Sequence, residues 1–209
     1  MKKILFIILI SCFSLIIISC SEDKEESTTD TVSTTSQMGG SIQGAELSLS
    51  TVVTTLAGTV DNGSANGTGT SASFNYPSGI TTDGTNLYVA DSSNHLIRKI
   101  VISTGAVTTV AGTGSSGSAN GTGTSASFYS PRAITTDGTN LYVAEYGNHL
   151  IRKIVISTGV VTTVAGTGSS GSANGTGTSA SFNSPHGITT DGTNLYVAEY
   201  GNHLIRKIE

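Results

Sequence analysis

The stretch 77–100, PSGITTDGTNLYVADSSNHLIRKI, decides the fold of this chain because it returns twice at a constant spacing. Its second copy is PRAITTDGTNLYVAEYGNHLIRKI at 131–154, and its third is PHGITTDGTNLYVAEYGNHLIRKI at 185–208. A fixed period of 54 residues indicates an array of one supersecondary unit, whose copies bury their apolar faces against one another. Residues 107–154 and 161–208 differ at only three positions, so function must come from the surface of the array or from the few differences between copies.

Within one copy, the apolar pattern predicts four short strands and no helix. We expect them at Ile80–Asp83, Asn86–Asp91, Leu96–Ile102 and Val107–Ala111. Turn sequences such as Asp-Gly-Thr-Asn separate them, which favours antiparallel strands joined by tight turns. Both faces of this sheet are apolar and need to be covered, as they are for a β-propeller blade that lies between two others.

The stretch 77–100 also resembles the NHL repeat. The resemblance rests on the Pro-x-Gly-Ile opening, the Leu-Tyr-Val-Ala-Asp strand and the Asn-His-Leu-Ile-Arg-Lys-Ile strand, and it extends to all three copies. It implies an all-β fold of propeller blades with four antiparallel strands each. Propellers of this family usually have about six blades, whereas this chain supplies three. The copies also depart from the family pattern where Asp91 becomes Glu145 and Glu199.

The order of strands bears on how the ring closes. The repeat region, 51–209, begins with TVVTTLAG at 51–58, which matches the fourth strand of the first two copies. We expect 51–58 to be the outer strand that closes the last blade, with Val52–Leu56 paired to Leu204–Ile208. Three alternatives remain open. Two chains form a six-bladed ring, each lending 51–58 to the other; the three blades form an open or closed assembly; or the chain is a shortened member of a longer family.

The N-terminus predicts export and a lipid anchor. Residues 1–19 have a basic start at Lys2 and Lys3 and an apolar run of about 15 residues, which is typical of a signal peptide and short for a membrane span. Ile-Ile-Ser-Cys, ending at Cys20, resembles a bacterial lipobox and implies that Cys20 is lipidated. Residues 20–50 then hold the lipidated cysteine and a flexible polar tether. We expect the protein to be anchored to a membrane of the cell envelope through Cys20. Ser21 favours the outer membrane or cell surface over the inner membrane.

Composition excludes some partners. Without residues 1–19 the chain carries 8 basic and 14 acidic residues, a net charge of −6, which disfavours nucleic acid. The mature chain would keep only Cys20 and no disulfide. No cofactor motif is found.

Repeated polar residues are expected to be structural. Three histidines stand at one position of each blade, so the repeat distributes them around the ring instead of gathering them at a metal: His95, His149 and His203. Three acids lie in identical turns and accept hydrogen bonds from the turn backbone: Asp83, Asp137 and Asp191. Three more end the second strand near one rim: Asp91, Glu145 and Glu199. We interpret these last as turn caps or solvated rim charges, with weak cation binding as the alternative.

The positions that vary between copies are the candidate ligand-binding residues. They lie next to the blade proline and beyond the second strand, where a propeller presents its channel entrance and end-face loops. The candidates are Tyr129, Arg132, Tyr146, His186 and Tyr200.

The favoured function is a non-catalytic envelope lipoprotein whose propeller binds a protein or a glycan. The alternative is a propeller enzyme of the lyase or lactonase type with a metal in the central channel. Such a site needs different residues from several blades, whereas these blades are nearly identical, and the chain has no nucleophile elbow or H-E-x-x-H motif. The expected partners are a membrane through Cys20, an unidentified ligand and, in one alternative, a second copy in a homodimer.

Overall fold

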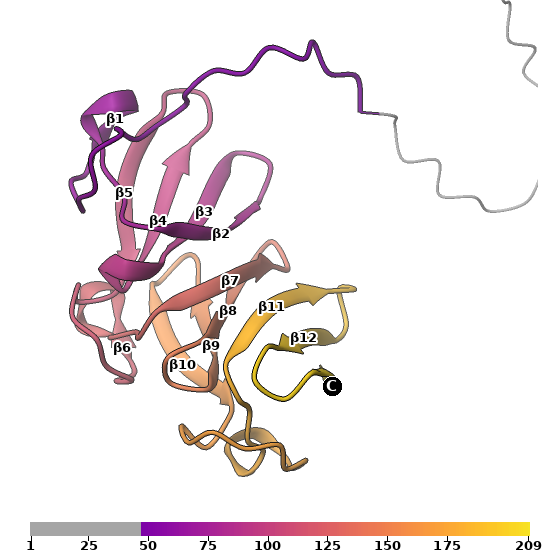
Figure 1. Cartoon of the computed structure of the whole chain (residues 1–209). Helices are drawn as coiled ribbons and strands as arrows, with labels where there is room; N and C mark the ends of the chain where they lie inside the picture. The colour runs from indigo at the N-terminus through magenta and orange to yellow at the C-terminus, as the bar shows by residue number, and fades with distance from the viewer. Residues whose placement is uncertain (1–46) are drawn as a thin grey trace, which may run out of the picture. The chain divides into compact units, whose positions relative to one another are not determined.

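The computed structural model describes residues 47–209, and its strands gather into three antiparallel sheets that follow the repeat (Figure 1). The strand order is β1-β5-β4-β3-β2 in the first sheet, β6-β10-β9-β8-β7 in the second and β11-β12-β13 in the third. Ser50–Glu209 forms one compact unit. The predicted signal peptide, Cys20 and residues 21–46 of the tether lie outside the described residues.

Each sheet is one blade. Blade 1 consists of β1 (Gly67–Thr68), β2 (Pro77–Thr82), β3 (Asn86–Asp91), β4 (Leu96–Val101) and β5 (Ala106–Ala111). Blade 2 consists of β6 (Gly121–Thr122), β7 (Pro131–Thr136), β8 (Asn140–Glu145), β9 (Leu150–Val155) and β10 (Val160–Ala165). Blade 3 consists of β11 (Pro185–Thr190), β12 (Leu195–Glu199) and β13 (Leu204–Ile208). Single 3-10 turns occur at Gly69–Ser71, Ser92–Asn94, Gly123–Ser125 and Gly177–Ser179.

These sheets confirm the all-β fold of antiparallel propeller blades. Blades 1 and 2 have the four predicted strands and a short fifth one, and blade 3 has the first three. Two details differ from the sequence prediction. The first strand starts at Pro77 instead of Ile80, and its register on β3 shifts between Pro77 and Gly79. The proline occupies the first strand position, where its missing N–H is tolerated. The Gly/Ser-rich segments are also more than surface loops, because each of the first two adds a short strand, β1 or β6, to the outer strand of its own blade.

The first strand of each blade lies next to the same strand of the neighbouring blade. In Figure 1, β7 lies between β2 and β11, and contacts between these strands join the three blades. A Cβ atom on Gly79 would stand 2.7 Å from the Cα of Ala133, so β2 can approach β7 this closely only with glycine at that position.

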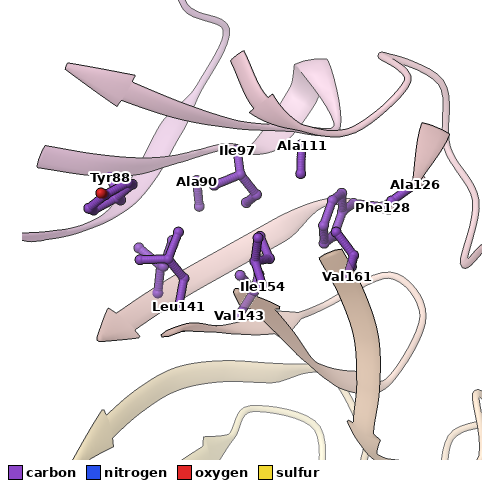
Figure 2. Packing of buried hydrophobic residues seen from close by; sticks show 11 residues of the cluster. Tyr88, Ala90, Ile97, Ala111, Ala126, Phe128, Leu141, Val143, Ile154 and Val161 are labelled. Carbon is purple, nitrogen blue, oxygen red and sulfur yellow. The ribbon is translucent and has the colours of Figure 1, made fainter. Parts of the chain in front are cut away.

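The core lies mainly between blades. Its first cluster joins Tyr88, Ala90, Ile97 and Ala111 of blade 1 to blade 2 residues that include Phe128, Leu141, Val143, Ile154 and Val161. Figure 2 shows the side chains of the first sheet pointing towards those of the second. A second cluster repeats the arrangement between blades 2 and 3, for example with Ile151 against Phe182 and Val197. Each blade therefore supplies one apolar face to each neighbour.

The expected ring closure is not formed within the chain. Residues 51–58 form no strand, and within residues 47–209 β13 pairs with β12 alone. The N–H of Gly58 donates to the carbonyl of Gly69 at 3.1 Å, which holds the end of this segment against blade 1. The outer faces are open as well, since Ile80 in β2 is 60% exposed and Ile205 in β13 is 75% exposed. The ring is therefore open within residues 47–209 of a single chain.

Candidate functional site

An ion pair is buried in every blade. The acid that ends the second strand meets the arginine in the middle of the third strand: Asp91–Arg98 at 2.8 Å, Glu145–Arg152 at 2.9 Å and Glu199–Arg206 at 2.7 Å. Both side chains of the first two pairs are fully buried. The same carboxylates accept hydrogen bonds from a backbone N–H of the preceding loop, as Glu145 does from Tyr129 at 2.6 Å, and from the side-chain amide of the asparagine in the Asn-His-Leu triplet.

The arginine of each pair also holds the long Gly/Ser-rich loop. In blade 2, Arg152 donates through Nη1 to the carbonyl of Ser127 at 3.1 Å and through Nη2 to the carbonyl of Ala119 at 3.0 Å. Its guanidinium lies 5.2 Å from the centre of the Phe128 ring, within cation–π distance. The network therefore joins loop, strand and inter-blade core in one arrangement, repeated in all three blades.

The rim interpretation of these acids was wrong. Asp91, Glu145 and Glu199 are buried, and their oxygens are taken up by arginine, amide and backbone donors, so they are not available to a cation. Burial raises the pKa of the Glu145 carboxyl above its ordinary value, although the Arg152 charge opposes this shift. The sequence did hold the missing signal, because an arginine follows each of these acids at the same spacing of seven residues.

Two of the three repeated histidines connect blades, as expected for a structural role. His95 has a left-handed backbone with φ of 58°, and its Nδ1 accepts a hydrogen bond from the N–H of Ser130 in the next blade at 3.2 Å. His149 accepts in the same way from Ser184 at 2.9 Å. His203, in blade 3, is exposed.

The repeated Asp-Gly-Thr-Asn turns are also built as predicted. Asp137 Oδ1 accepts from the N–H groups of Thr139 at 2.8 Å and Asn140 at 2.6 Å, and its Oδ2 accepts from the Tyr142 hydroxyl at 3.0 Å. Partial burial acts to raise the pKa of Asp137, but the hydrogen bonds from Asn140, Thr139 and Tyr142 outweigh it and lower this pKa to about 2. These carboxylates are turn anchors.

Four of the five predicted binding residues come together. The ring centres of Tyr146 and His186 are 6.4 Å apart, and those of His186 and Tyr200 are 6.1 Å apart. The guanidinium of Arg132 lies 5.3 Å from the centre of the Tyr146 ring. We call Arg132, Tyr146, His186 and Tyr200 the aromatic row.

The backbone explains why these positions converge. Arg132 is the extra residue of a β-bulge, because the register of β7 on β8 passes from Pro131 directly to Ala133. His186 has the same place in β11. A bulge turns a side chain out of the ladder, and here it turns it towards the residue that follows the second strand, Tyr146 or Tyr200. In blade 1 the equivalent residues are serines, and the hydroxyls of Ser78 and Ser92 are 2.6 Å apart.

The row is accessible and carries an unused donor. Tyr200 is 67% exposed, and His186 is exposed as well. Arg132 forms no salt bridge among the described residues, and its buried Nε has no hydrogen-bond partner there. Tyr129, the fifth candidate, is separate from this set, since its ring packs edge-on against His95 at 5.7 Å. The arrangement offers aromatic faces and a cation to a ligand, which are the groups most enriched at binding sites.

Two further properties concern residues 47–209 only. This part of the chain has no group of three or more histidine, cysteine, aspartate or glutamate residues that could hold a metal ion. It also has no helix of sufficient length and apolar character to span a membrane.

Comparison with known proteins identifies the repeat. The family model described as NHL repeat matches residues 74–100 and 182–208. NHL repeat-containing protein 2 of Homo sapiens is 32% identical over 154 residues, which are 66% of this chain and 21% of that protein. The chloroplastic protein SUPPRESSOR OF QUENCHING 1 of Arabidopsis thaliana is 33% identical over 150 residues, 66% of this chain and 14% of that protein. The chain thus spans about a fifth or less of the length of these relatives.

Solved structures show the same fold. An auxiliary nutrient binding protein from Bacteroides thetaiotaomicron superposes with a TM-score of 0.56 at 25% identity, over 62% of this chain and 36% of that one. A second auxiliary nutrient binding protein, from Bacteroides ovatus, superposes with a TM-score of 0.53 at 27% identity, over 60% of this chain and 35% of that one.

Proposed function

Because this chain belongs to the NHL-repeat proteins, we propose that it is a non-catalytic binding module that holds its ligand on the aromatic row. The observation that carries this proposal is the convergence of Arg132, Tyr146, His186 and Tyr200 on one surface. They are among the few positions at which the copies differ, while the residues that hold the blades together repeat almost unchanged. Contact-forming side chains at varied positions of a rigid scaffold are typical of a ligand surface.

The chemistry of the row fits a glycan. Tyrosine and histidine rings present flat apolar faces with polar edges, so they can stack on the apolar face of a sugar ring and hydrogen-bond its hydroxyls. The guanidinium of Arg132 adds donors that no protein carboxylate neutralises within residues 47–209. The two auxiliary nutrient binding proteins of similar fold support binding over catalysis. A protein ligand is the second outcome that the experiment below distinguishes.

The enzyme alternative, with a metal in the channel, has less support. The carboxylates repeated at the end of the second strand form salt bridges with Arg98, Arg152 and Arg206. The carboxylates of the Asp-Gly-Thr-Asn turns accept from their own turn backbone and from a tyrosine hydroxyl. A lyase or lactonase needs an acid or base that is free to exchange a proton with its substrate.

Tyr146→Ala and Tyr200→Ala together should weaken ligand binding at least about tenfold. Thermal unfolding should change much less, because Tyr200 is exposed and Tyr146 is only partly buried. The measurement is binding of the full chain to an array of envelope glycans, in parallel with capture from an envelope extract treated or untreated with glycosidases. Capture that survives glycosidases but not proteolysis would assign a protein ligand. Tyr129→Ala is the matched control and should bind normally. If it loses as much binding as the double variant, the row is not the ligand surface.

We also propose that the module acts at the cell envelope, anchored through Cys20 with the following polar residues as a tether. The support is the signal-like pattern of 1–19 and the Ile-Ile-Ser-Cys sequence that ends it. Cys20→Ala should abolish the incorporation of labelled palmitate and release the protein from the membrane fraction. Cys12→Ala is the control, because it lies inside the predicted signal peptide and should change neither readout. A Cys20→Ala protein that still sediments with membranes would rule out the lipid anchor.

A further inference from the structure

The segment 52–57 has the sequence of an outer strand but no sheet to join. It aligns with β5 and β10, and its Val53 corresponds to Val107 and Val161. Val53 is 95% exposed, whereas Val107 and Val161 are 2% and 1% exposed. Val52 and Leu56 are exposed too. An extended apolar segment of this kind gains free energy when a sheet edge receives it.

Blade 3 offers the matching edge. In blades 1 and 2 the third strand pairs with an outer strand, in the register Lys99↔Thr108 and Lys153↔Thr162. The equivalent edge of β13 is unpaired within the described residues, and a groove runs along it that is lined by Ala180, Phe182, Arg206 and Ile208. An unpaired strand edge is a template for a further strand. Continuing the observed register places Thr54 opposite Lys207 and Val53 opposite Ile208.

The outer faces of blades 1 and 3 are also complementary, because they correspond to faces that pack against each other between blades inside the chain. Ile205 of blade 3 is 75% exposed, while its equivalents Ile97 and Ile151 are fully buried against the following blade. On blade 1, Ile80 is 60% exposed, while its equivalent Ile134 is 5% exposed. The inter-blade hydrogen bond is also missing at both ends. His203 occupies the acceptor position of His95, and Tyr76, with φ of 50°, occupies the donor position of Ser130.

A single docking arrangement pairs the edge of β13 and covers the outer faces of blades 1 and 3. Pro77 follows Ala57 by 20 positions, as Pro131 follows Ala111. The N–H of Gly58 already donates to Gly69 at 3.1 Å, as that of Gly112 donates to Gly123 at 3.2 Å. Residues 52–57 therefore have the same position relative to blade 1 as β5 has relative to blade 2. When residues 52–57 pair with the edge of β13, blade 1 packs against blade 3 in the same way as blade 2 packs against blade 1.

We propose that two copies of this chain assemble head to tail, each lending residues 52–57 to blade 3 of the other. The occupant is a second copy because both faces and the strand come from this one sequence and repeat an interface that the chain already makes twice internally. Such a heterologous contact closes into a ring or continues as a filament. Two copies give six blades, which lies within the usual range of about four to eight. Closure also places Ser78 of the second copy beside Tyr200, as His186 lies beside Tyr146.

Disulfide trapping in the full chain tests this assembly. Thr54→Cys with Lys207→Cys should give a species of twice the chain mass on non-reducing gels, because directly paired strand residues lie within disulfide reach. Lys99→Cys with Thr108→Cys is the matched control and should link within one chain without changing its mass. Each single variant, and the unmodified chain with its Cys12 and Cys20, sets the background. An intrachain link between positions 54 and 207, no link at all, or a ladder of higher multiples would overturn the two-copy ring.

A second variant separates assembly from folding. Val53 is exposed in the single chain, so a Val53→Asp chain should still fold into its blades and unfold cooperatively. In the assembly the new charge would be buried, so dimerisation measured by sedimentation in detergent should weaken at least about tenfold. A Val53→Asp chain that dimerises as well as the unmodified chain would contradict the strand exchange.

Discussion

Arg152→Met is expected to lower the free energy of unfolding by about 3–5 kcal/mol, the cost of leaving a buried charge without its partner. Both side chains of the Glu145–Arg152 pair are fully buried, so the substitution leaves the carboxylate in a buried position without its cationic partner. The substitution also removes the donors that hold the carbonyls of Ala119 and Ser127, so the loop before blade 2 should loosen as well. Chemical unfolding followed by circular dichroism measures the loss.

The protonation state of Glu145 gives this prediction a pH signature. Burial raises the pKa of Glu145 in the folded state, and removing Arg152 should raise it further. A carboxyl with a raised folded pKa costs stability where it is charged, and this cost disappears as pH falls below the pKa of the unfolded chain, about 4.3. The deficit of Arg152→Met should therefore be largest at neutral pH and smaller near pH 4. Adding Glu145→Gln should recover part of it at neutral pH. An equal deficit at both pH values would mean that the lost packing of the arginine, and not the orphaned charge, is responsible.

Phe128→Ala should destabilise the chain by about 3–5 kcal/mol, as expected when a large buried side chain leaves a cavity. The Phe128 ring is fully buried between blades 1 and 2, where it contacts the cluster of Ile97 and Ala111 and lies under the guanidinium of Arg152. Its loss therefore weakens the blade interface and the loop anchor together. Amide hydrogen exchange should show faster exchange in both blades.

The matched control is Phe74→Ala, at the same place in blade 1. Its ring is only partly buried, because no described blade precedes it. Since the proposed second copy would cover this face, both phenylalanine variants should be compared in the Val53→Asp background. There Phe74→Ala should cost less than Phe128→Ala. Equal costs would show that the inter-blade contact contributes little to the stability provided by Phe128.

Much of this architecture could be predicted from the repeat. A four-strand unit with two apolar faces has to be covered by its neighbours, so the blade arrangement follows from the alternation of apolar residues around turns such as Asp83-Gly84-Thr85-Asn86. The turn role of Asp83 and the structural role of His95 could be predicted from their position in the repeat. All five candidate binding residues were chosen because they vary where the scaffold does not, and four of them lie close together in the structure.

The rest depended on distances that no spacing in the sequence reveals. Asp91 and Arg98 stand on neighbouring strands, and only folding of the hairpin under the long loop removes water from both and makes them an ion pair. Tyr146 and His186 come from different blades, and a bulge at the start of β11 turns His186 towards Tyr146, whereas Tyr129 meets His95 instead. The sequence by itself determined the blade and its repetition, because these follow from local apolar pattern and turn chemistry. Only the tertiary structure decided which polar side chains are buried, which gather at the surface and which faces have no neighbour, because each of these depends on how one blade stacks on the next.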